Sequence, residues 1–167
     1  MSIHRLIGAL FLAIGLTNMV MAADSRPDVA QIINKTEASA ILGEPVKDPS
    51  QRSGDGTDGY YSKCNYYSVQ RGKSLIIRLQ LPGPNAIGPQ KELQLLAAAN
   101  GTMEKVSDVG DAAQMFNGRE SGFASRMLML YVAKGNTFLT VGLAGFGDDA
   151  VALEKAKTVA QKLLEHL

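Results

Sequence analysis

In the stretch 74–81 (SLIIRLQL), leucine or isoleucine at every second position alternates with residues of mixed polarity. Because successive side chains of a β-strand point to opposite faces of a sheet, one face of this strand is expected to be apolar and the other mixed. This pattern predicts a strand in an antiparallel sheet that packs one face on a core. The apolar set is Leu75, Ile77, Leu79 and Leu81, and the mixed set is Ile76, Arg78 and Gln80.

Two hairpins are expected. Residues 60–69 precede the alternating strand and join it through a tight turn at Arg71-Gly72. A second hairpin connects 126–134 to 137–144 through Gly135-Asn136. Its first strand contains MLMLYV, which is apolar on both faces and therefore predicts a central strand covered on both sides. In the first hairpin Ser62, Cys64 and Tyr66 face one way and Lys63 and Asn65 the other, and a further strand is expected through Met115 and Phe116.

The clearest helix signal covers residues 35–42. Asn34 followed by Glu37 forms the pattern of a capping box, and Gly43 is suited to a left-handed C-terminal cap. Further helices are expected over 89–99, capped by Gly101, and over 149–166, N-capped by Asp148, with a short helical turn near 29–33.

These elements predict the α+β class. We expect one antiparallel sheet of five to six strands with helices packed on a face, built from two similar halves of a helix and a meander, and closed by a long C-terminal helix. Residues 48–59 (DPSQRSGDGTDG) are polar and without periodicity, so they are expected to form a mobile loop.

The first residues have the pattern of a secretory signal peptide. A positive charge at Arg5 precedes an apolar run over 6–16, which is too short for a helix to cross about 30 Å of hydrocarbon. Small or apolar residues at 20–22 favour cleavage after Ala22, with Ala23 as the alternative. We therefore expect residues 1–22 to be removed and 23–167 to form one soluble domain, periplasmic or secreted, without stable membrane anchoring.

Charge argues against nucleic acid as a partner. The chain has 17 Lys and Arg against 16 Asp and Glu, and Arg5 is the only one of these within the predicted signal peptide. The remaining domain of about 145 residues is then neutral overall, which gives no electrostatic preference for nucleic acid or anionic lipid. A chain of this length can bury a core without disulfides.

Five segments occur in a characteristic order: 36–46 (TEASAILGEPV), 64–66 (CNY), 106–113 (VSDVGDAA), 134–143 (KGNTFLTVGL) and the C-terminal helix. In succession they resemble a group of small secreted bacterial domains of unknown function, many of them actinobacterial lipoproteins. The resemblance implies an α+β fold of the PsbP-like kind and an envelope location, and it implies no catalytic residues. The lipid-attachment cysteine and second cysteine of many such domains are absent from this sequence.

Candidate chemical groups are few. His166 is the penultimate residue, a poor position for a catalytic base and a good one for stabilising a helix C-terminus. Asp55 and Asp58 do not have the spacing of a calcium loop, and Asp148 and Asp149 would repel an anion at the glycine-rich stretch 142–147. We expect no catalytic residue, metal or cofactor.

Cys64 is the only cysteine, so the chain cannot form an internal disulfide. Free cysteine is among the most buried residue types, which favours an inert thiol. The alternatives are an intermolecular disulfide, which an oxidising compartment permits, and a reactive thiolate.

Four of the five tyrosines cluster at Tyr60, Tyr61, Tyr66 and Tyr67, and each face of the expected strand receives two of them. Tyrosine is common at binding interfaces and also in cross-strand packing. The sequence thus predicts a non-catalytic binding module of the bacterial envelope whose tyrosine strand or sheet face contacts an envelope protein or a small molecule. A small hydrolase or thiol enzyme, and a structural dimer linked through Cys64, are the alternatives.

Overall fold

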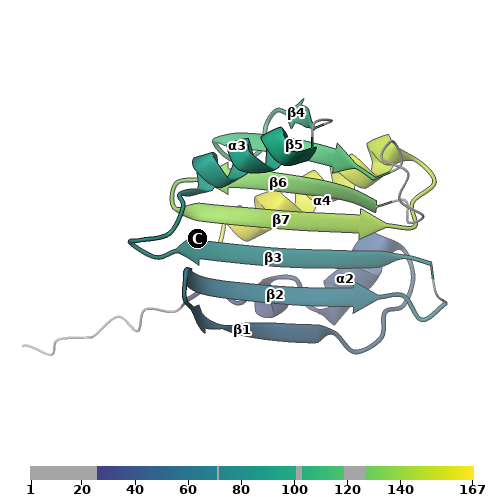
Figure 1. The fold of residues 1–167 in the computed structure, drawn as a ribbon. Coiled ribbons are helices and arrows are strands. Elements are labelled where there is room, and N and C mark those ends of the chain that lie inside the picture. The colour runs from purple at the N-terminus through teal and green to yellow at the C-terminus, as the bar shows by residue number, and fades with distance from the viewer. Residues whose placement is uncertain (1–25, 71, 101–102, 119–126) are drawn as a thin grey trace, which may run out of the picture.

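A single seven-stranded antiparallel sheet organises the molecule (Figure 1). This computed structural model describes residues 26–70, 72–100, 103–118 and 127–167. The strand order is β1-β2-β3-β7-β6-β5-β4. The strands are β1 Ser50–Gly56, β2 Gly59–Tyr67, β3 Ser74–Pro82, β4 Glu104–Val106, β5 Ala112–Asn117, β6 Met127–Lys134 and β7 Thr137–Ala144.

The sheet consists of two meanders joined side by side. Strands β1 to β3 follow one another along the chain, as do β4 to β7, and the pairing of β3 with β7 joins the two sets. The register at this junction places Ile77 opposite Val141 and Arg78 opposite Thr140. A helix precedes each meander, so the pattern of a helix followed by a meander occurs twice.

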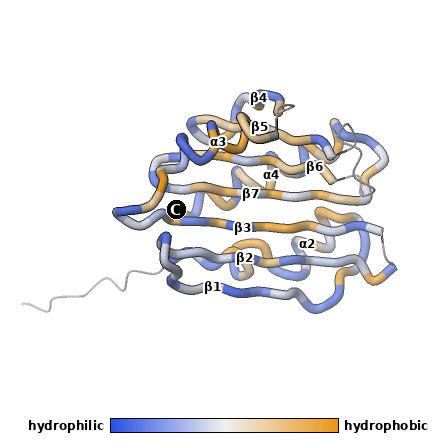
Figure 2. Tube along the Cα trace, in the orientation of Figure 1, coloured by the Kyte–Doolittle hydropathy of each residue, from blue (hydrophilic) through white to orange (hydrophobic). Residues whose placement is uncertain are grey.

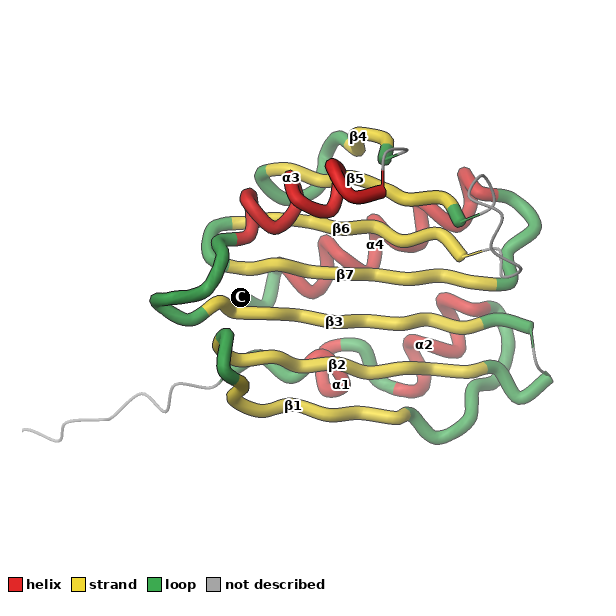
Figure 3. The backbone as a smooth tube through the Cα atoms, viewed as in Figure 1, coloured by secondary structure: helices red, strands yellow, loops and turns green. Residues whose placement is uncertain are grey.

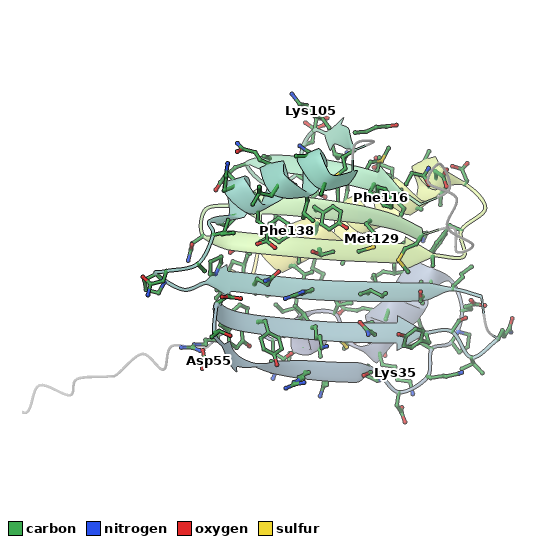
Figure 4. The ribbon with its side chains drawn as sticks, viewed as in Figure 1. Lys35, Asp55, Lys105, Phe116, Met129 and Phe138 are labelled. Carbon is green, nitrogen blue, oxygen red and sulfur yellow. The ribbon has the colours of Figure 1, made fainter. Side chains whose placement is uncertain are left out.

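Helices lie on both faces of the sheet (Figure 3). Helices α1 Val29–Ile32, α2 Lys35–Leu42 and α4 Asp149–Leu164 cover one face, whereas α3 Pro89–Asn100 packs on the other. The expectation that the helices share a face is therefore wrong for α3. The reason is that β6 and β7 are apolar on both sides, so their second face also needs a cover. Leu93 of α3 packs there on Ala133 and Phe138, and Phe138 lies on the α3 side of the sheet (Figure 4).

The main core lies between the sheet and α1, α2 and α4. Leu75, Ile77 and Leu79 of β3 are all fully buried in it, as the alternation of 74–81 predicts. Burying three leucine or isoleucine side chains contributes roughly 5–9 kcal/mol before the entropy of ordering the chain is subtracted. Apolar residues predominate along β6 and β7, whereas β1 is mostly hydrophilic (Figure 2).

The ends of the helices confirm the local signals of the sequence. The Asn34 side chain accepts hydrogen bonds from the backbone N–H groups of Thr36 and Glu37, and the Glu37 carboxylate accepts one from the N–H of Asn34. Gly43 ends α2 in the left-handed conformation, with φ of 72°. The side chain of Asp148 caps the first turn of α4.

Two strands were not predicted. Residues 50–56, expected to lie in a loop, form the edge strand β1, and the three-residue strand β4 brings the total to seven rather than five or six. β1 has no apolar side chain, so its stability comes from backbone pairing with β2 and leaves no periodic pattern. β4 is too short to show a period.

Some sequence predictions fall outside the described residues. These are the signal peptide with its cleavage at Ala22 or Ala23, the turn residue Arg71 and the cap Gly101. Within the part of the chain that the structure describes, no helix is long and apolar enough to cross a membrane.

Candidate functional site

Half of the sheet face that carries α3 is left without a helix. α3 packs against β5 and β6, and no described helix lies over β1, β2 and β3 on this side (Figures 1 and 3). The opposite side of β2 and β3 is covered by α1 and α2, whereas nearly all residues of β1 are exposed. We call the uncovered surface the open face. Its residues are Ser50, Arg52 and Gly54 of β1, Tyr61, Lys63, Asn65 and Tyr67 of β2, and Ile76, Arg78 and Gln80 of β3.

Three cations form a line across the open face. Arg52 lies directly opposite Lys63, and Lys63 lies directly opposite Arg78. Side chains opposed in this way have Cβ atoms about 5 Å apart. All three are exposed, and none forms an ion pair or side-chain hydrogen bond with another described residue. We call Arg52, Lys63 and Arg78 the cationic row.

An aromatic ring borders the cationic row. Tyr61 is half-buried, and the guanidinium carbon of Arg52 lies 6.0 Å from the centre of its ring. Tyr61, Lys63 and Arg78 line a shallow depression of about 230 Å³. The guanidinium of Arg52 therefore lies over the face of the ring, which attracts a cation, and the same ring lines the depression together with Lys63 and Arg78.

No carboxylate belongs to the open face as defined by its strand residues. Glu92 on α3 is an acidic side chain that interacts electrostatically with a cation of the open face. Burial raises the pKa of the Glu92 carboxyl, the positive charge of Arg78 lowers that pKa, and the negative charge of Asp58 raises it. Arg78 and Glu92 are thus electrostatically coupled across the boundary between the open face and α3.

The tyrosine cluster divides between the two faces of β2. Tyr66 is fully buried, and its hydroxyl donates a hydrogen bond to the carbonyl oxygen of Ile33. The hydroxyl of Tyr60 donates to the carbonyl oxygen of Pro27. Tyr60 and Tyr66 therefore support the N-terminal helices, and their prediction as contact residues is wrong for Tyr66, which no ligand can reach. Tyr61 and Tyr67 lie on the open face, where Tyr67 is 46% exposed.

Cys64 is inaccessible. Its side chain is fully buried on the core face of β2, and burial raises the pKa of its thiol. A raised pKa keeps the thiol protonated near neutral pH, whereas nucleophilic attack needs the thiolate. Both alternatives that use Cys64 are therefore contradicted: the folded chain presents neither a reactive thiolate nor a sulfur atom that a second chain can reach.

The remaining candidates have structural partners. Asp55 forms an ion pair with Arg26, and the Asp58 carbonyl oxygen accepts a hydrogen bond from the N–H of Gly83. His166 Nδ1 lies 2.8 Å from the carbonyl oxygen of Lys162 at the end of α4. Among the described residues no group of three His, Cys, Asp or Glu side chains is placed to hold a metal ion.

Sequence reasoning placed Lys63 and Asn65 together on one side of their strand, and Arg78 on the mixed side of its own. It did not find the cationic row, because Arg52 was assigned to a loop and the register between strands was unknown. No known family model matches this sequence, and no curated protein is significantly similar to it.

Proposed function

We propose that this chain is an exported, non-catalytic binding module of the bacterial envelope and that its ligand lies on the open face. The observation behind this proposal is the unequal cover of the sheet. Three helices cover one face, while α3 covers only the β5–β6 part of the other. The uncovered part is where the aromatic and cationic side chains gather.

The residue types of the open face suit binding. Tyrosine and arginine are enriched among the residues that dominate interface energies, because each offers a large contact area together with a hydrogen-bonding group. Tyr61, Tyr67, Arg52 and Arg78 provide these groups on one surface. A strand scaffold holds them in fixed register, so little conformational entropy is lost when a ligand binds.

The envelope location rests on the signal-peptide pattern of residues 1–22. The proposal of a binding module rather than an enzyme is supported by the burial of Cys64, the only cysteine, and by the position of His166 just beyond the end of α4. Neither group is placed for the nucleophilic chemistry that the sequence left open.

The buried cysteine makes a direct test possible. Because Cys64 is the only cysteine and is inaccessible, a cysteine introduced on the surface is the single thiol that a maleimide reaches. Asn65→Cys places this thiol on the open face, and Lys134→Cys places it at the exposed end of β6 on the opposite side. Both variants are labelled with the same bulky maleimide and used to capture components of an envelope extract, which mass spectrometry identifies.

We expect the label at position 65 to abolish capture of a component that the unlabelled protein retains. The label at position 134 leaves that capture intact. If both labelled proteins retain the same components, the ligand does not lie on the open face and the proposal is wrong. If a labelled or unlabelled sample converts a captured small molecule into a product, the chain is an enzyme and the proposal is also wrong.

A further inference from the structure

We infer that the open face binds an acidic helical segment of a partner protein, whose carboxylates meet the cationic row. This inference rests on the proposed function and names the chemistry of its ligand. Like charges placed directly opposite on neighbouring strands destabilise a sheet. Arg52, Lys63 and Arg78 form two such pairs, and none of the three has an ion-pair partner among the described residues. Glu92 on α3 interacts electrostatically with Arg78 but forms no ion pair with it. A bound row of carboxylates removes this repulsion and replaces it with attraction.

The shape of the surface favours a macromolecule over a small molecule. The depression beside Tyr61 has a volume of about 230 Å³, below the range of roughly 300–1,000 Å³ that is usual for sites that enclose a small ligand. The cationic row also extends beyond it to the edge strand β1. A partner laid across three strands uses the whole row, whereas a small anion uses only Lys63 and Arg78.

The side chains beside the row favour a polypeptide over other polyanions. Ile76, Asn65 and Gln80 flank the cations and offer apolar contact and hydrogen bonds, and Tyr61 and Tyr67 add aromatic area. This mixture is that of a protein–protein interface. A nucleic-acid surface relies on a broad basic footprint, whereas this chain, with 17 Lys and Arg against 16 Asp and Glu, has almost no net charge to extend the row of three cations.

The spacing of the row favours a helix. Neighbouring strands lie about 4.8 Å apart, so the cations are repeated at about that distance. Carboxylates three or four residues apart on a helix lie about 5–6 Å apart at Cβ, whereas alternate residues of a strand are about 6.8 Å apart. The guanidinium groups of Arg52 and Arg78 can each hold a carboxylate through two hydrogen bonds. α3 shows that this side of the sheet accepts a helix.

The test uses an alanine-based helical peptide with Glu at every fourth position, titrated into the purified protein at low salt and followed by NMR. Three single variants, Arg52→Gln, Lys63→Gln and Arg78→Gln, are compared with their triple combination. Lys134→Gln is the matched control, because it removes the same charge from the opposite side of the sheet. All the substituted side chains are exposed, so the variants are expected to remain folded, which circular dichroism checks.

We expect each single open-face variant to weaken binding by up to about fivefold and the triple variant by roughly a hundredfold, since an exposed ion pair contributes at most about 1 kcal/mol. Lys134→Gln retains the affinity of the parent protein. Binding weakens as salt rises, because salt screens exposed charges. A peptide with Lys in place of Glu does not bind.

Three results overturn the inference. These are no binding of the Glu peptide, equal binding by the triple variant, and tighter binding of hyaluronate, a single-stranded oligonucleotide or anionic vesicles through the same three residues. The label at position 65 separates this failure from failure of the proposed function. If that label still blocks capture from the extract, the open face is a binding site for a different ligand; if it does not, the proposed function fails as well.

Discussion

The hydroxyl of Tyr66 on β2 donates a hydrogen bond to the backbone carbonyl oxygen of Ile33, in the segment between α1 and α2. Both residues are buried, so this bond ties the N-terminal helices to the sheet at a point that water does not reach. Tyr66 therefore has a structural role, although two of its neighbours in the tyrosine cluster face solvent on the other side of the strand.

Removing this hydroxyl is expected to destabilise the fold. Tyr66→Phe leaves the Ile33 carbonyl without its donor, and an unsatisfied buried acceptor costs about 1–3 kcal/mol. Urea unfolding followed by circular dichroism measures the change. Tyr61→Phe is the matched control, because the Tyr61 hydroxyl makes no hydrogen bond with another described residue, and we expect its effect to stay within about 0.5 kcal/mol. Equal losses in the two variants would contradict the structural role of Tyr66.

The stability of the protein is expected to fall at alkaline pH. Burial raises the pKa of the Cys64 thiol above its ordinary value of 9.0 and that of the Tyr66 phenol above 10.0. The unfolded chain therefore loses these protons at a lower pH than the folded chain, and their loss stabilises the unfolded state. The free energy of unfolding is unaffected by these groups below about pH 8 and decreases as the pH rises through 9 and 10.

Urea unfolding at a series of pH values measures this decrease, and Cys64→Ala should reduce the part that begins near pH 9. The same thiol provides an independent check at pH 8. A thiol reagent should label it slowly in the folded protein and at once in urea, which serves as the positive control. Rapid labelling of the folded protein would show that the thiol is accessible.

The sequence predicts the elements whose stability depends on their own side chains. The alternation of residues 74–81 identifies the buried face of β3, because Leu75, Ile77 and Leu79 on that face are fully buried and Leu81 is partly buried against the same core. α2 is predicted at its observed bounds because its capping box and Gly43 act within a few residues. Patterns of this kind involve only residues that are close in the sequence, so they can be recognised without knowledge of the fold.

What the sequence does not predict depends on partners far along the chain. β1 is a strand because β2 pairs with it, and its polar side chains contain no sign of that pairing. The apolar stripe of α3 shows that the helix packs on something, but it does not show which face of the sheet. The cationic row exists only once the register of β1, β2 and β3 is known, since its three members are separated by 10 and 14 residues that form turns and neighbouring strands.

The β1–β2 turn is expected to depend on a glycine. Gly59 has a φ of 121°, a backbone conformation that residues other than glycine rarely adopt. A Cβ atom there would also collide with the carbonyl oxygen of Leu81 on β3. Gly59→Ala should therefore destabilise the protein by about 3 kcal/mol or more. Thermal unfolding measures the loss. Gly54→Ala is the control, two residues before the end of β1 at Gly56. A Cβ there meets nothing within 4 Å, so this exchange should be nearly neutral or slightly stabilising.

Glu92 connects the fold to the proposed ligand. The pKa of its carboxyl is raised mainly by burial, and the positive charge of Arg78 opposes that rise. Ionised Glu92 therefore places a negative charge within the field of the cationic row. Glu92→Gln removes this charge while keeping the shape of the side chain, so the acidic peptide should bind about two- to fivefold more tightly.

The reciprocal measurement uses the carboxyl itself. Arg78→Gln removes the charge that favours ionised Glu92, so the pKa of Glu92 should rise further, which NMR titration of its side chain detects. Lys134→Gln lies on the other side of the sheet and should leave that pKa in place. One combination of results would place the peptide elsewhere: Arg78→Gln shifts the pKa of Glu92, but Glu92→Gln leaves the peptide affinity unchanged. The peptide then does not contact Arg78, and it lies nearer Arg52 and the edge strand β1.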